Sequence, residues 1–159
     1  MNKIIQSYIF LFLWIMFLVG IGSLCGLLTK DQMFSWYLNL NRSPLTPPSY
    51  VFGIVWTILY VLIASAGWMI WNADNVNGLL TIKIAYIVQL LLNWSWTPLF
   101  FTFHFIGGAF IVLISLVSVV GFLIVKTYTQ LPFVSVLLIP YAAWLVCATY
   151  LQFYIWLYN

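Results

Sequence analysis

The chain has 159 residues, of which 65% are hydrophobic, 20% aromatic and only 4% charged. A soluble domain carries about 25% charged residues, so this chain could not cover a surface that faces water. Its net charge of +3 arises from five basic and two acidic side chains, too sparse for the clustered Lys and Arg of a nucleic-acid-binding surface. The sequence has one histidine and no glutamate, and Cys25 and Cys147 lie in apolar runs, so no cluster of metal ligands is expected. We therefore expect an integral membrane protein with no nucleic-acid partner and no metal site.

Five apolar segments follow one another along the chain, each near the roughly 20 residues that a helix needs to cross a bilayer. They cover residues 4–28, 49–72, 79–103, 106–126 and 133–157. Lipid cannot satisfy open backbone groups, and the runs lack the alternation of a transmembrane barrel, so all of them should be helices. The first run is longer than the about 7–15 apolar residues of a signal peptide and should remain as a helix. The sequence thus predicts one all-α domain, a bundle of five transmembrane helices with its termini on opposite sides of the membrane.

The basic residues between the segments bear on orientation. Lys3, Lys83 and Lys126 lie on the N-terminal side of the membrane, and Lys30 and Arg42 lie on the other side. Cytoplasmic loops carry an excess of Lys and Arg. Three basic residues on the N-terminal side against two on the other side favour a cytoplasmic N-terminus. The sequence does not select a particular membrane.

Residues 29–48 form the longest connection, and a loop of this length in a compact domain is usually functional or disordered. It contains Phe34, Trp36 and Tyr37, which need a surface to bury against. One interpretation is a lid that folds back over one end of the bundle. The other is an interfacial anchor, because Trp and Tyr favour the depth of the lipid headgroups.

Two adjacent prolines, Pro47 and Pro48, end this loop and start the second helix. Proline is tolerated in the first helical turn because its missing N–H has no partner there. Phe52, Trp56 and Tyr60 then recur every four residues and share one face of the helix. Leucine would serve to span lipid, so spanning the membrane does not by itself explain the aromatic face.

A polar stripe runs along the third segment, where Gln89, Asn93 and Thr97 recur every four residues. Polar groups at membrane depth are costly unless they find partners. The stripe is either glue between helices, at about 0.6–2 kcal/mol per hydrogen bond, or a set of ligand-orienting groups in an apolar cavity. Pro98 deprives the carbonyl of Trp94 of its donor and should bend the helix at this end of the bundle.

One face of the fifth segment carries Pro140, Trp144, Ala148 and Gln152. A large indole beside a small alanine leaves room next to a flat wall, which suits planar apolar ligands. Trp144 lies at mid-membrane depth, so we assign it to this wall rather than to the belt of aromatic residues at the interface.

The remaining small and polar residues indicate contacts rather than chemistry. His104 lies in the short connection that makes the third and fourth helices antiparallel neighbours, where an interfacial position is expected. Gly22 and Gly26 have the spacing of a close helix contact or a dimer seam. The sequence contains no Ser-His-Asp set, carboxylate pair or Gly-rich phosphate loop, which disfavours hydrolase and phosphoryl-transfer chemistry.

Three stretches resemble the translocator protein family, also called tryptophan-rich sensory proteins, TspO/MBR proteins or peripheral-type benzodiazepine receptors. They read WYLNLNRSPLTPPSYVFGIVWTILY, LLNWSWTPLFF and PYAAWLVCATYLQFYIWLYN. The resemblance covers nearly the whole chain, and the small size and few charges are those of a bacterial member.

The resemblance implies a five-helix bundle, often dimeric, with a cavity that opens toward the loop between the first two helices. Members bind porphyrins such as protoporphyrin IX, synthetic isoquinoline carboxamides and benzodiazepines, and some bind cholesterol. No cofactor is required, and porphyrin is the expected ligand. Carried over position by position, the resemblance places ligand-binding side chains at Tyr37, Pro47, Trp56, Tyr60, Asn93, Trp96, Thr97, Trp144 and Ala148.

Three functions follow from these patterns together with what the resemblance implies. The first is a receptor, sensor or transport-associated protein for porphyrins and similar planar apolar molecules. The second is light-dependent breakdown of a bound porphyrin through radicals on Trp56 and Trp144, since no acid–base machinery is visible. The third is a structural or partner-binding membrane protein in which the polar stripe serves only as glue.

Overall fold

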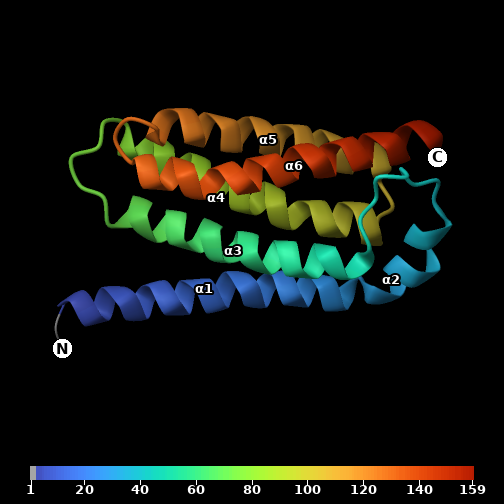
Figure 1. Cartoon of the computed structure of the whole chain (residues 1–159), viewed down its shortest axis with the longest axis horizontal. Coiled ribbons are helices and arrows are strands. Elements are labelled where there is room, and N and C mark those ends of the chain that lie inside the picture. Colours follow the sequence, from blue (N-terminus) through green and yellow to red (C-terminus); the bar gives the residue numbers. More distant parts are fainter. Residues whose placement is uncertain (1–2) are drawn as a thin grey trace.

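The computed structural model describes residues 3–159, apart from the side chains of residues 3, 4 and 34. Within these residues, five helices are long and apolar enough to cross a membrane. They are α1 (Lys3–Leu28), α3 (Ser49–Trp71), α4 (Leu79–Thr97), α5 (Ile106–Thr127) and α6 (Pro132–Tyr158). The helices run along one common axis, with the N-terminus at one end of the bundle and the C-terminus at the other (Figure 1). The predicted five-helix, all-α architecture is confirmed, and the helix ends differ from the predicted ones by one or two residues except in α4.

Each helix packs against particular neighbours. α1 lies against α3, α3 against α6, α6 against α5, and α5 against α4, as the short connection between α4 and α5 predicts. α1 also reaches α4, because the indole Nε1 of Trp14 donates to the Tyr86 hydroxyl over 3.3 Å and Phe17 meets Trp94 edge to face. Most apolar side chains of α1 remain exposed, as expected for a helix at the edge of a bundle whose solvent is lipid.

α4 changes its winding at Pro98. The α-helix ends at Thr97 and continues as a π-helical turn, η2 (Pro98–Thr102). Pro98 has no N–H to offer the carbonyl four residues earlier, and the wider turn is closed by the Phe103 N–H, which donates to the Pro98 carbonyl over 3.0 Å. The predicted bend is thus a local widening of the helix, and it turns Phe100 and Phe101 into the interior, where both are buried.

The long connection between α1 and α3 lies at the end of the bundle that also carries the C-terminus (Figure 1). It contains a short helix, α2 (Lys30–Ser35), and a 3-10 turn, η1 (Tyr37–Asn39). The indole of Trp36 stacks on the imidazole of His104 at a centroid distance of 4.0 Å, which joins the connection to the link between α4 and α5. The side chain of Phe34, for which burial was also expected, and that of Lys3, used for orientation, lie outside the described residues.

The same connection is tied to the end of α6. The Asn41 N–H donates to Asn159 Oδ1 over 2.8 Å, and Asn159 Nδ2 donates back to the Asn41 carbonyl over 3.1 Å. The Ser43 hydroxyl lies 3.3 Å from the Tyr150 hydroxyl. These contacts place the connection across the end of the bundle, and its opening and closing as a lid stays a prediction.

Candidate ligand-binding cavity

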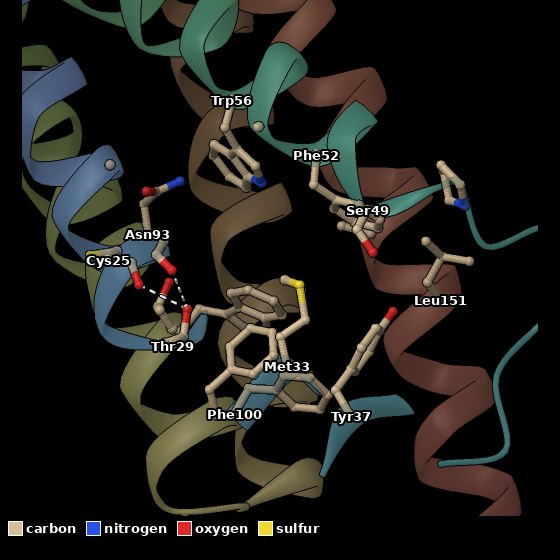
Figure 2. Close-up of a pocket in the computed structure, with 18 of the residues that line it drawn as sticks. Cys25, Thr29, Met33, Tyr37, Ser49, Phe52, Trp56, Asn93, Phe100 and Leu151 are labelled. Atoms are coloured by element: carbon tan, nitrogen blue, oxygen red, sulfur yellow. Dashed lines mark hydrogen bonds between the residues drawn. The ribbon is translucent and has the colours of Figure 1, made fainter. Parts of the chain in front are cut away.

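A cavity of about 350 Å³ lies between α1, α3, α4 and α6, at the end of the bundle that the α1–α3 connection crosses. Trp56 and Phe52 reach into it from α3, and Met33 and Tyr37 face them from the connection (Figure 2). Ligand sites typically occupy about 300–1,000 Å³ and have mostly apolar walls with a few polar groups. The volume of this cavity falls within that range and its walls are mostly apolar, so the cavity can hold a small ligand.

The structure brings eight of the nine predicted site residues to the wall of this one cavity. They are Tyr37, Pro47, Trp56, Tyr60, Asn93, Trp96, Thr97 and Ala148. These residues come from α3, α4, α6 and the connection, and they are far apart in the sequence. The spacing arguments and the family resemblance therefore selected side chains that share one space.

Trp144 is the residue that does not line the cavity. Its indole packs edge to face on Phe52 at a centroid distance of 5.7 Å, and it is the Phe52 ring that reaches the cavity. On α6 the cavity is lined one turn further along, by Ala148, Leu151 and Gln152. Helical spacing placed Trp144 on the correct face, but Phe52 of the neighbouring helix covers it at that depth. Of the two indoles assigned a radical role, only Trp56 lies on the cavity wall.

The aromatic walls are held by ring contacts. Trp56 lies 5.6 Å from the Tyr60 ring and meets Tyr141 edge to face at 6.3 Å. Trp96 stacks on Phe100 at 5.4 Å with an interplanar angle of 13°. Such contacts add about 0.5–1.5 kcal/mol each beyond the burial of area. Contacts within the protein therefore hold these rings against one another.

A buried chain of hydrogen bonds forms the inner end of the cavity. The Tyr60 hydroxyl donates to Asn93 Oδ1 over 2.8 Å, and Asn93 Nδ2 donates to the Tyr141 hydroxyl over 2.9 Å. The Tyr141 hydroxyl donates in turn to Gln89 Oε1 over 3.1 Å. Gln89 and Asn93 therefore hydrogen-bond α3 and α6 to α4, and of the polar stripe only Asn93 and Thr97 border the cavity.

Two glycines of α1 allow the cavity to reach that helix. A Cβ atom at Gly22 would collide with the ring of Tyr60, so only glycine permits this approach. A Cβ atom at Gly26 would meet nothing within 4 Å, because Gly26 borders the cavity. The Gly22–Gly26 pattern thus belongs to a close contact with α3 and to the cavity wall, and a dimer seam at this place is not needed to explain it.

Several lining residues were not selected from the sequence. In α1 they include Val19, Ser23 and Cys25, and in the connection Met33 and Arg42. α1 is apolar on all sides, so no hydrophobic pattern marks the face that borders the cavity. The only signal in α1 was the pair of glycines, which are spaced to lie on one face.

Arg42 and Tyr37 set the electrostatics of the cavity mouth. The guanidinium carbon of Arg42 lies 5.2 Å from the centroid of the Tyr37 ring, within the range of a cation–π contact. Burial raises the pKa of the Tyr37 hydroxyl, and the positive charge of Arg42 opposes this shift in part. Tyr37 is therefore neutral at physiological pH, and its hydroxyl remains able to donate a hydrogen bond.

Comparison with known proteins assigns the chain to a family, because the sequence profile of the TspO/MBR family matches residues 12–157. The chain belongs to the TspO/MBR family. It is 32% identical over 145 residues to the tryptophan-rich protein TspO of Archaeoglobus fulgidus, covering 91% of this chain and 94% of that protein. It is 30% identical over 139 residues to the translocator protein of Bos taurus, covering 85% of this chain and 81% of that protein.

A third relative is the tryptophan-rich sensory protein of Cereibacter sphaeroides, 31% identical over 147 residues, or 88% of this chain and 89% of that protein. Of these three relatives, one is named as a translocator, one as a sensory protein and one as a tryptophan-rich protein. Family membership and five long apolar helices together make this chain an integral, multi-pass membrane protein. The cavity described above is thus the candidate site of a TspO/MBR membrane protein.

Proposed function

We propose that this TspO/MBR protein is a membrane receptor or transport-associated protein that binds porphyrins and similar planar apolar molecules in the cavity. The observation that carries the proposal is the convergence of flat rings from separate elements on one space. Trp56 comes from α3, Trp96 from α4 and Tyr37 from the connection, and all of them line the cavity. Flat aromatic walls favour a flat ligand, because its rings can stack on the rings of the wall or meet them edge to face.

The small residues of the wall support the same ligand class. Ala148 lies on the α6 side, and Gly26 and Gly53 lie on the α1 and α3 sides. Small side chains open space between the aromatic groups, and leucine at these positions would fill it. A binding role explains this combination of large rings and absent side chains, and a purely structural role does not require it.

The test fills the cavity from one wall. Ala148→Phe places a ring in the cavity, while Ala143→Phe makes the same change at an exposed position of α6. Binding of protoporphyrin IX to purified protein is followed by quenching of tryptophan fluorescence and by the ligand-induced rise in melting temperature. We expect Ala148→Phe to weaken binding by about tenfold or more, which is about 1.4 kcal/mol, and Ala143→Phe to bind as the wild type does.

Equal affinities in the two variants and the wild type would place porphyrin outside this cavity. A wild-type protein that shows no thermal shift with protoporphyrin IX or with an isoquinoline carboxamide would favour the structural role instead. The matched variant matters because the chain has nine tryptophans, and a porphyrin can quench them without a defined site.

A further inference from the structure

We propose that Arg42 binds a carboxylate at the edge of the ligand, so that the cavity selects planar apolar molecules with an acidic edge over neutral ones. This inference rests on the proposed function, since it concerns the ligand of the same cavity. It assigns to Arg42 a role in specificity at the mouth of the cavity, and it names the chemical class of the preferred ligand.

The charge pattern of the cavity supports this role. Among the described residues that line it, Arg42 is the only charged one, and its side chain is half-buried. The chain has two acidic residues, Asp31 and Asp74. Asp74 lies in the connection between α3 and α4, at the opposite end of the bundle (Figure 1). Within the described residues neither aspartate forms an ion pair with Arg42, so its charge is available to a ligand.

The position of the guanidinium is set by its aromatic neighbour. Arg42 lies over the Tyr37 ring, and that ring meets Phe100 edge to face at a centroid distance of 6.0 Å. Phe100 is buried in the π-helical turn, so the contact anchors Tyr37 to the bundle. A guanidinium is planar and can bind a carboxylate with two parallel hydrogen bonds. The neutral Tyr37 hydroxyl lines the same cavity and can donate a further hydrogen bond to the same anion.

The surroundings of Arg42 differ on its two sides. On one side is the apolar cavity, and on the other is an open outer hollow lined by polar groups that include Asn41, Ser43 and Thr46. When a charge pair is buried in an apolar interior, the free energy lost with its hydration can exceed the free energy gained from the attraction between the charges. A carboxylate held at this boundary keeps part of its hydration while the rest of the ligand lies among apolar side chains. Protoporphyrin IX has this form, with an apolar macrocycle and two propionates on one edge.

The experiment compares protoporphyrin IX with its dimethyl ester, which has the same ring and no charge at that edge. Both are titrated into wild-type protein, Arg42→Gln and Arg42→Lys in nanodiscs of phosphatidylcholine. Lys30→Gln is the matched control, because it removes one positive charge from the same connection at a residue that does not line the cavity. The quantity of interest is the ratio of the ester Kd to the diacid Kd, because differences in membrane partitioning cancel between variants.

We expect this ratio to fall by about tenfold from the wild type to Arg42→Gln, with the affinity for the ester unchanged. Lys30→Gln should keep the wild-type ratio, and Arg42→Lys should keep part of it, because lysine retains the charge without the planar fork. Melting temperatures without ligand check that the variants are folded.

Two results would overturn the inference and leave the proposed function intact: the same ratio in wild type and Arg42→Gln, or equal weakening of both ligands by the substitution. The first result would be expected if Arg42 held a lipid phosphate. In that case, replacing phosphatidylcholine by phosphatidylglycerol in the disc should change the melting temperature of the wild type and leave that of Arg42→Gln unchanged. Failure of both ligands to bind the wild type would instead reject the proposed function.

Discussion

At the end of the bundle that carries the α3–α4 and α5–α6 connections, side chains fill the space between the helices, whereas at the end crossed by α2 the same helices enclose a cavity. Ile70, Ile82, Leu123 and Val134 are almost completely buried in the filled half. In the hollow half, the interior side chains of α3 and α4 border the cavity. The hydrogen-bonded chain from Tyr60 to Gln89 lies between the halves, so the membrane-buried polar groups mark where packing stops and binding space begins.

In both halves a glycine of one helix faces a tyrosine of its neighbour, and the result differs between the halves. In the filled half a Cβ atom at Gly67 would collide with the hydroxyl of Tyr86, and in the hollow half one at Gly22 would collide with the ring of Tyr60. Tyr86 donates to the Ile63 carbonyl over 2.9 Å and so completes a closed core, whereas Tyr60 turns one side to the cavity. A glycine opposite a tyrosine permits close helix packing in either case, and the partner of the hydroxyl group decides whether the result is core or wall.

The largest expected effect comes from placing one substitution in each half. Gly67→Leu should destabilise the protein by about 3 kcal/mol, because overpacking a filled core displaces Tyr86 from its hydrogen bonds. Gly53→Leu lies at the cavity, where a Cβ atom meets nothing within 4 Å, and should lower porphyrin affinity with little change in stability. Denaturation in mixed micelles measures the first effect and ligand titration the second. Equal destabilisation by both variants would erase the distinction between the halves.

The boundary itself is tested by the two polar residues of α4 that form it. Asn93→Leu removes the partner of both Tyr60 and Tyr141, while Gln89→Leu removes one bond from Tyr141 together with an amide nitrogen that has no partner among the described residues. We expect losses of unfolding free energy of about 2 kcal/mol for Asn93→Leu and about 1 kcal/mol or less for Gln89→Leu. Only Asn93→Leu should also change ligand affinity, because Gln89 does not line the cavity. The reverse order of stability would mean that the chain of hydrogen bonds does not hold the wall.

The difference between the halves also decides what could be predicted from the sequence. Five apolar runs fix five spanning helices, because lipid permits almost no other backbone structure. Periodicity of four then placed Trp56, Tyr60 and Asn93 on interior faces, and all of them border the cavity. Periodicity gives a face but not a depth, and for this reason Trp144 was assigned to a wall that Phe52 covers. Arg42 was not selected because the sequence does not show that a basic loop residue folds back over the end of a bundle.

A smaller effect is expected at the contact between the connection and the bundle. His104→Ala removes the ring that stacks on Trp36 and the imidazole Nε2 that lies 3.3 Å from Gln32 Oε1. If the connection acts as a lid, this change should speed porphyrin dissociation several-fold and alter unfolding free energy by about 1 kcal/mol or less. His104→Phe keeps a ring for the stack and should restore slow dissociation. Stopped-flow displacement measures the rate, and unchanged dissociation in His104→Ala would argue that the connection is only an interfacial anchor.

The smallest expected effect concerns alkaline pH at the cavity mouth. Burial raises the pKa of Tyr37 in the folded protein above its unfolded value of about 10. Above that pH the unfolded chain loses the proton while the folded protein keeps it, so the folded state binds more protons and stability falls as pH rises. Tyr37→Phe removes this contribution, and the difference in unfolding free energy between variant and wild type should shift in favour of the variant from pH 9 to pH 11. A difference that stays constant over this range would show that the Tyr37 hydroxyl is hydrated, and the mouth would then be wetter than the apolar walls behind it.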